Sequence, residues 1–296
     1  MIPHFLVIGA QKSGTTWMDR NLRTHPDICL PPEKETHYFD LPKNIPFVFF
    51  VFASERGDRY WVISRLKRAY RRAKANPAAM GWYLRYYFLP RTDNWYSSLF
   101  TPDAGQVVGD ITPHYAVMDE KKIAHVHALS PDMKIIYLMR NPIERMWSQA
   151  AMHFSERSGY RGIHTIDEQT LIKFLCKPKQ LAHARYFKNL QRWEKYYASE
   201  QIFTGFFEDI ADAPEQLLKS IFQFLGINAS ADYISSLSTE KIFARDYPPI
   251  PPPIAHLLAE LLIDDIEALH QRFNNVYTAQ WLASAMSYRA IGSAVS

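Results

Sequence analysis

A short glycine-containing loop near the start of the chain constrains the fold more than any other feature. The segment Gly9 to Thr16 (GAQKSGTT) follows the apolar run FLVIG and precedes a segment, from about Thr15 to Thr24, with the character of a helix. An apolar run of this length predicts a fully buried strand. A glycine loop between a strand and a helix N-terminus presents backbone N–H groups and partial positive charge to a phosphate. We therefore expect a phosphate-binding site here.

Strand-then-helix units recur along the rest of the chain. Runs of apolar residues predict the strands, and apolar residues at 3.6-residue spacing predict the helices. Alternation of this kind is typical of an α/β fold with a mainly parallel sheet. The predicted elements are, in chain order, strands at 106–109, 134–139 and 201–207, and helices ending near Phe154, running over 214–225 and running over 254–273.

Composition bounds the class of protein. With 296 residues, 47% apolar and 22% charged, the chain can bury a large core and is not a disordered protein. The excess of 34 basic over 30 acidic residues, +4, suits an anionic ligand without requiring nucleic acid. Two cysteines, Cys29 and Cys176, allow at most one disulfide, and the chain starts without a signal peptide. A soluble, cytoplasmic protein is the expectation.

Residues 44–90 form an unusual insert, rich in aromatic side chains. Its apolar run, 46–53, is too short to span a membrane, although contact with a membrane surface stays open. A basic stretch, RLKRAYRRAK, runs from Arg65 to Lys74. One interpretation is an amphipathic surface helix with a solvated charged face. The other is a segment that builds an acceptor pocket or meets an anionic surface.

The glycine loop differs from a Walker A loop. A Walker A loop carries lysine directly after its second glycine. Here Thr15 follows Gly14, and Lys12 lies two positions before that glycine. The donor is therefore expected to be a phosphorylated nucleotide other than plain ATP.

Two motifs together resemble the sulfotransferases that use 3′-phosphoadenosine 5′-phosphosulfate (PAPS). QKSGTTW, at 11–17, is similar to their 5′-phosphosulfate loop, and YLMRNPIERMWS, at 137–148, to their 3′-phosphate segment. The segments at 25–40, 109–116 and 206–227 resemble the heparan-type and related bacterial carbohydrate sulfotransferases. The resemblance covers most of the chain apart from the insert. It implies a P-loop-containing three-layer fold in a single domain, 1–296.

The resemblance also implies how the donor is held. The sequence shows no HxxxH or Cys/His spacing, so we expect lysine and arginine to neutralise the donor without a metal ion. Sulfuryl transfer requires a cation at the phosphate oxygen of the leaving group. Lys12 is the candidate for that cation. The remaining loop residues would hold the 5′-phosphate through backbone amides and hydroxyls; they are Ser13, Gly14, Thr15 and Thr16.

Further donor contacts are implied later in the chain. Arg140 and Ser148 suit the 3′-phosphate, because arginine makes forked, charge-assisted contacts with phosphate. Trp17 is a candidate for stacking on adenine, or else a core residue. Tyr186 resembles a tyrosine near the nucleotide, although a core position explains it equally well. Arg245 occupies the place of a basic loop that normally covers the 3′-phosphate, where the match is poor.

The acceptor hydroxyl needs a base to take its proton. The resemblance places Glu35, within ETHYFD, at the family's catalytic glutamate. Glu33 and His37 are alternatives close by in the chain, and His114, within TPHY, is a third. A neutral imidazole is the natural base at pH 7, whereas a glutamate needs a raised pKa.

Two departures from the family pattern concern the segment GDITPHYA. Asp110 replaces the usual glutamate and Ile111 the usual lysine, which affects how acceptor and sulfate are held there. The leading hypothesis remains a PAPS-dependent sulfotransferase acting on a hydroxyl or amine, with a carbohydrate or glycoconjugate favoured as acceptor. The alternatives are a P-loop kinase or other phosphotransferase, and a non-catalytic protein that binds the product PAP. The sequence leaves the acceptor's identity and the oligomeric state undetermined.

Overall fold

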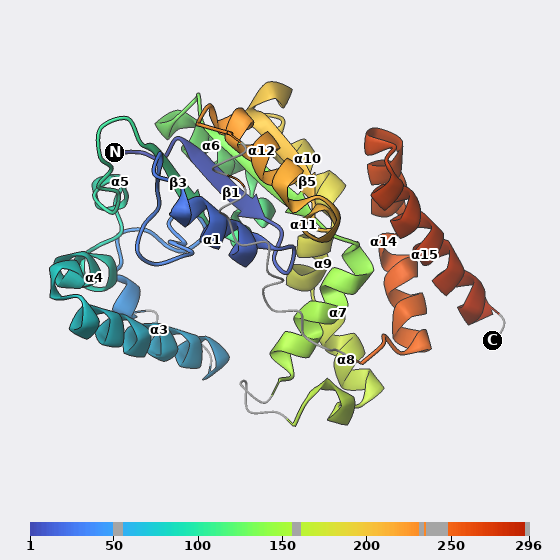
Figure 1. Ribbon diagram of the computed structural model, residues 1–296. Helices are drawn as coiled ribbons and strands as arrows, with labels where there is room; N and C mark the ends of the chain where they lie inside the picture. The colour runs from blue at the N-terminus through green and yellow to red at the C-terminus, as the bar shows by residue number, and fades with distance from the viewer. Residues whose placement is uncertain (50–55, 156–160, 231–233, 235–247, 294–296) are drawn as a thin grey trace.

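A five-stranded parallel sheet forms the centre of the molecule (Figure 1). The computed structural model describes residues 1–49, 56–155, 161–230, 234 and 248–293. The strands lie in the order β2-β3-β1-β4-β5, and every pairing is parallel. Their bounds are β1 Phe5–Gly9, β2 Ile28–Cys29, β3 Val107–Ile111, β4 Lys134–Met139 and β5 Ile202–Phe206.

Helices connect and cover the strands. The N-terminal half carries α1 Thr15–Thr24, α3 Arg56–Ala75, α4 Met80–Phe88, α5 Asp93–Ser97 and α6 Glu120–Leu129. The following part carries α7 Pro142–His153, α8 Glu168–Leu175, α9 Pro178–Ala184, α10 Tyr186–Trp193, α11 Asp209–Asp212 and α12 Pro214–Leu225. The chain ends with α14 Pro252–Phe273 and α15 Val276–Ser293.

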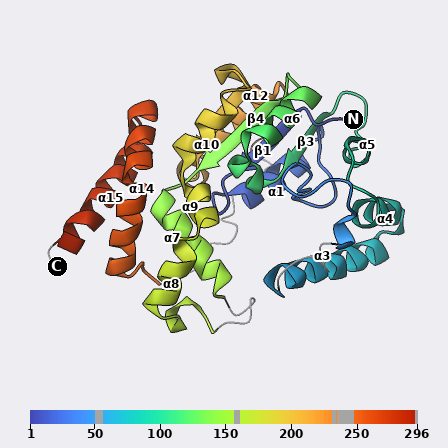
Figure 2. The ribbon, with the colours of Figure 1, turned by 180° about the vertical axis from the view of Figure 1, so that it is seen from behind.

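The two faces of the sheet bury separate apolar clusters. Alternate side chains of a strand point to opposite faces, so Phe5 and Val7 face one cluster and Leu6 and Ile8 face the other. Helices α1 and α12 cover the first face. Helices α6, α7 and α10 cover the second, and α6 and α10 lie in front of the sheet in Figure 2. The expected three-layer α/β fold is confirmed.

Most predicted elements occur within one or two residues of their expected bounds. The first strand and the helix after the glycine loop match fully, and α12 begins at Pro214 and ends before Gly226, which adopts φ 77°. The strand expected at 106–109 is β3, displaced toward its C-terminal end. Strand β2 was not predicted, because its two residues are too short to show a periodic pattern.

The last two helices form a hairpin against one end of the sheet. Helix α14 packs on α7 and α10, and its Asp265 carboxylate accepts from the backbone N–H groups of Phe187 and Lys188 at 3.2 and 3.4 Å. From α15, Trp281 donates to Glu208, just after β5, at 2.8 Å. The hairpin therefore braces both the start of α10 and the end of β5.

Candidate functional site

The predicted site residues gather at the carboxyl ends of the strands. The glycine loop follows β1, Glu35 follows β2, His114 follows β3 and Arg140 follows β4. Strands β1 and β4 are neighbours from which the chain leaves in opposite directions, and ligands of open α/β sheets bind at such a switch point. The topology thus brings four distant segments to one edge of the sheet.

The glycine loop is shaped for an anion. Gly14 adopts φ 83°, and a Cβ added there would lie 2.1 Å from Cδ1 of Ile210, so the position requires glycine. The first turn of α1, starting at Thr15, contains no acidic residue. Its leading N–H groups have no acceptor within the helix and carry the positive end of the helix dipole. A phosphate or sulfate group would satisfy both features.

A lysine that sequence reasoning overlooked points at this helix end. The Lys34 ammonium donates to the Thr15 hydroxyl at 3.2 Å and to the Thr16 hydroxyl at 3.3 Å. Burial lowers the pKa of this lysine, against the opposing charge of Glu35. Its only signal in the sequence was its position next to Glu35 in the motif.

The loop's own lysine contacts the helix after β4. The Lys12 ammonium lies 3.8 Å from Sδ of Met152, on α7. Ile111, in the place of the family's usual lysine, is 2% exposed and belongs to the apolar cluster around α1 and α12. That position therefore supplies no charge to the site.

Arg140 lies at the end of β4 beside the loop after β5. Its guanidinium sits 4.6 Å above the ring of Phe207 and donates to Glu144 at 3.0 Å. Its Nε is buried and has no hydrogen-bond partner among the described residues. The group is therefore held in place and retains an unused donor that a phosphate oxygen could accept from.

The other predicted nucleotide contacts are more deeply placed. Ser148 on α7 is 3% exposed. Trp17 is 2% exposed and packs in the core with Met18. Tyr186, at the start of α10, is fully buried against Tyr137, and burial raises its pKa to about 12. Arg245 lies outside the described residues.

Glu35 belongs to a chain of three titratable side chains. His37 contacts Asp40 through Nδ1 at 2.8 Å and Glu35 through Nε2 at 3.3 Å. Burial alone would lower the pKa of His37, but the charge and hydrogen bond of Asp40, together with those of Glu35, raise it to about 9. Burial alone would raise the pKa of Glu35, but His37, Lys34 and Arg65 lower it to about 2. At neutral pH the pair is a carboxylate and an imidazolium.

The remaining candidate bases differ in state. His114 contacts His183 at 3.0 Å, and burial lowers the pKa of His114 to about 4, so this imidazole is neutral. Its ring centroid lies 6.2 Å from that of His37. Glu33 is 2% exposed and forms an ion pair with Arg72 at 2.8 Å. The Glu33 carboxylate is therefore engaged by a residue of α3, whereas one third (33%) of the Glu35 side chain remains exposed.

Asp110 organises the segment that carries Glu35. One carboxylate oxygen of this buried residue accepts from the hydroxyls of Thr36, Tyr96 and Tyr115 at 2.6, 2.9 and 3.0 Å. The other accepts from Thr112 at 2.9 Å. Burial raises the pKa of Asp110 in spite of these four donors. The residue that replaces the family's glutamate thus anchors the neighbouring chain through hydroxyl hydrogen bonds.

Comparison with known proteins agrees with this geometry. The family model of the sulfotransferase domain matches residues 2–245, well over half of the chain. The chain belongs to the sulfotransferase family.

Relatives and solved structures of sulfotransferases support the assignment. The chain is 25% identical over 230 residues to human heparan sulfate glucosamine 3-O-sulfotransferase 6, covering 76% of this chain and 52% of that protein. It is 24% identical to human bifunctional heparan sulfate N-deacetylase/N-sulfotransferase 2, covering 80% and 23%. This chain thus spans about half or less of these relatives.

The fold matches as well. A sulfotransferase from Alicyclobacillus acidocaldarius superposes with a TM-score of 0.66 at 25% identity, over 95% of this chain and 99% of that one. Mouse sulfotransferase SULT7A1 complexed with PAP superposes with a TM-score of 0.54 at 12% identity, over 95% and 88%. The second likeness concerns the fold alone.

In this member of the family the insert reaches the candidate site through its helix α3. Arg65, 5% exposed, donates to the backbone carbonyls of Lys34 and Glu35 at 3.0 and 3.1 Å and to the Tyr86 hydroxyl at 3.1 Å. The buried face of α3 therefore holds the segment that carries the candidate base. Neither interpretation of the basic stretch anticipated this contact.

The opposite face of α3 is solvated, as the first interpretation expected. Arg72 extends the inner face by donating to the Pro32 carbonyl at 3.3 Å, in addition to its ion pair with Glu33. Among the side chains of this helix that the structure describes, the exposed basic ones are Lys67, Arg68, Arg71, Arg72 and Lys74, and Arg72 alone of these pairs with Glu33. No helix in the described part of the chain is long and apolar enough to cross a membrane.

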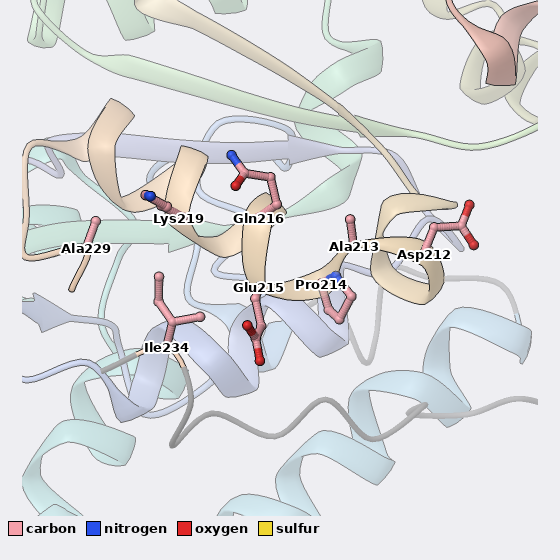
Figure 3. Close-up of a pocket in the computed structure, with 8 residues that line it drawn as sticks. All are labelled: Asp212, Ala213, Pro214, Glu215, Gln216, Lys219, Ala229 and Ile234. Atoms are coloured by element: carbon pink, nitrogen blue, oxygen red, sulfur yellow. The ribbon is translucent and has the colours of Figure 1, made fainter. Parts of the chain in front are cut away.

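A cavity of about 530 Å³ lies apart from these residues, along the first turns of α12 (Figure 3). Figure 3 shows Glu215 and Ile234 extending toward the same space. None of the predicted site residues lines it, so it does not mark the donor site. Its lining residues are Asp212, Ala213, Pro214, Glu215, Gln216, Lys219, Ala229 and Ile234.

Proposed function

We propose that this sulfotransferase transfers a sulfuryl group from PAPS to a hydroxyl or amine of a carbohydrate or glycoconjugate. Glu35 is the general base in this proposal. The observation that carries it is the adjacency of Lys34, on the anion-binding end of α1, and Glu35, which is ionised and partly exposed. One backbone segment thus brings an anion site and a base together. The names of the heparan sulfate relatives favour a glycan acceptor.

The residues at the sheet edge fit the two charged ends of this donor. The N-terminus of α1, with the Thr15 and Thr16 hydroxyls, suits the 5′-phosphosulfate. Arg140 has an unused buried Nε–H for the 3′-phosphate. PAPS supplies an activated sulfuryl group, and the protein's part is positioning and charge stabilisation.

The reaction balances with the groups present. A bond forms between the acceptor oxygen or nitrogen and sulfur, while the bond from sulfur to the phosphate oxygen breaks and leaves its electron pair on that oxygen. Glu35 takes the acceptor proton. Its pKa of about 2 makes it ionised but weakly basic in the unliganded protein. An anionic donor bound nearby raises the pKa of a carboxylate. Donor binding would therefore move the pKa of Glu35 toward the range of an effective base.

The experiment is a paired binding and transfer measurement. We expect calorimetry to detect PAP binding without Mg²⁺, and no stronger binding of ATP with Mg²⁺. With PAPS and a heparan-type glycan, Glu35→Gln should lower kcat by about 10²–10⁴-fold and leave PAP affinity unchanged. Glu168→Gln, on the surface of α8, is the matched control.

The outcomes separate the alternatives. Preferred binding of ATP with Mg²⁺ would replace this proposal with a phosphotransferase. PAP binding without sulfuryl transfer to hydroxyl or amine acceptors across a glycan panel would favour a non-catalytic PAP-binding protein. Full activity in Glu35→Gln would move the base elsewhere, with His114 as the neutral candidate.

A further inference from the structure

The Lys34 ammonium occupies an electrostatically unusual place. It lies within hydrogen-bond distance of the hydroxyls of Thr15 and Thr16, the first two residues of α1. Its side chain is half-buried, and its hydrogen bonds go to two neutral hydroxyls. The charges of Glu35 and Asp19 act on this ammonium and partly offset its loss of water. An anion in direct contact with the ammonium would stabilise it further.

The helix beside it adds positive potential at the same place. The N-terminus of an α-helix carries partial positive charge and favours anions, whereas cations are favoured at the C-terminus. Gly14, the residue that caps α1, provides no side-chain acceptor, and no acidic residue lies in the first turn. Two positive features therefore converge on one point, and a bound anion would neutralise both.

Hydrogen bonds hold the backbone of Lys34 in place beside the N-terminus of α1. Arg65 donates to the Lys34 carbonyl at 3.0 Å, and the same arginine holds Glu35. The side chain therefore starts from an anchored main chain, and its two hydroxyl contacts hold the ammonium at the end of α1. Ile111, in the place of the family's usual lysine, is apolar, whereas Lys34 donates to the hydroxyls of both threonines in the loop.

We propose that Lys34 is a second donor-binding cation and a catalytic residue, which contacts the 5′-phosphosulfate of PAPS at the N-terminus of α1. This inference rests on the proposed function. As the bond between sulfur and the phosphate oxygen breaks, Lys34 stabilises the negative charge left on that oxygen and stays protonated. The acceptor proton goes to Glu35, so adjacent residues serve the leaving group and the nucleophile.

Calorimetry with two nucleotides tests the contact. PAP carries 5′- and 3′-phosphates, whereas adenosine 3′-monophosphate lacks the 5′-phosphate that Lys34 would bind. We expect Lys34→Met to weaken PAP binding by about 10- to 100-fold and to leave the affinity for adenosine 3′-monophosphate within about twofold. Lys34→Arg, which retains the charge, should recover part of the lost PAP affinity. Lys67→Met, on the solvated face of α3, should bind both nucleotides as the original protein does.

Transfer kinetics test the catalytic part. Lys34→Met should lower kcat with PAPS by about 10²–10³-fold at saturating donor, because a preorganised charge at the leaving group acts mainly in the transition state. Thermal melting of each variant separates this effect from misfolding. A folded Lys34→Met protein with unchanged PAP affinity and kcat overturns the inference. So does equal weakening of both nucleotides, which would indicate general damage to the site. Failure of the unsubstituted protein to bind PAP would instead refute the proposed function.

Discussion

Arg65 donates a hydrogen bond of 3.1 Å to the backbone carbonyl of Glu35, across 30 residues of sequence. The arginine belongs to the insert, and the glutamate belongs to the sulfotransferase motif. Since Arg65 also holds the Lys34 carbonyl, one guanidinium fixes the main chain behind both the candidate base and the candidate second cation. We therefore propose that the insert acts on the chemistry through the main chain, with Arg65 as a positioning residue.

Removing this guanidinium should reduce turnover more than donor binding. Arg65→Met leaves two part-buried carbonyls and the buried Tyr86 hydroxyl without this donor, so we expect a loss of about 1–3 kcal/mol in the free energy of unfolding. A displaced Glu35 should lower kcat by about 10²-fold, because small misplacements of a catalytic group are costly. Chemical denaturation and steady-state kinetics measure the two effects.

The same helix offers the control for Arg65. Arg68→Met removes an equal charge from the exposed face of α3 and should change neither quantity. Partial recovery of kcat in Arg65→Lys would show that donation to the carbonyls is what matters. Normal kcat in a folded Arg65→Met protein would contradict the positioning role.

His37 should make stability depend on pH on the alkaline side. Its pKa in the folded chain, about 9, exceeds the usual value in an unfolded chain of about 6.5. The folded state therefore binds the proton more tightly, which adds stability in full below about pH 6.5. This contribution should disappear as pH rises from about 6.5 to about 9. The free energy of unfolding, measured by denaturant titration at intervals of one pH unit, should fall over that window.

Substitution of His37 isolates this dependence. His37→Gln should flatten the fall between pH 6.5 and 9, because glutamine does not titrate. Asp40→Asn removes the carboxylate that raises the pKa of His37 in the folded chain, so the fall should become smaller and end at a lower pH. An unaltered pH profile in His37→Gln would show that another group causes it. Glu35 does not interfere, because its pKa of about 2 keeps it ionised throughout this window.

Gly14 should tolerate no side chain. A Cβ there would meet Ile210 at 2.1 Å, and the φ of 83° is unfavourable for any other residue. Gly14→Ala should therefore lower both thermal stability and PAP affinity. Gly81→Ala in α4 is the matched control, because a Cβ there meets nothing within 4 Å. That control should be neutral or more stable by up to about 1 kcal/mol. An equal response of the two variants would contradict a special conformation at Gly14.

The features of this structure that could be predicted from the sequence are those that neighbouring residues determine. The glycine loop, the strands and α12 are encoded by neighbouring residues, through apolar periodicity and the helix boundaries at Pro214 and Gly226. The contacts of Lys34 and Arg65 could not be predicted, because they join segments that only the tertiary fold brings together. Within a basic stretch, the sequence alone does not distinguish a buried arginine from a solvated one.

The choice of base was equally beyond the sequence. Glu35, His37 and His114 were all plausible, because their residue types alone give similar chemistry. Their partners distinguish them: Asp40 keeps His37 protonated, whereas burial beside His183 keeps His114 neutral. Those pairings depend on three-dimensional position.

Asp110 gives the last prediction. The sequence presented it as a departure from the family's glutamate, yet it accepts four hydroxyl hydrogen bonds within the core. Asp110→Asn replaces one acceptor oxygen by an NH₂ group, which faces hydroxyl donors and cannot satisfy them. We expect a loss of about 1–3 kcal/mol in the free energy of unfolding. Thr36 would shift with its lost partner and move Glu35, so kcat should fall while PAP affinity stays. Asp103→Asn, at an exposed site, is the control. Stability and kcat equal to those of the control would mean that Asp110 does not organise this segment.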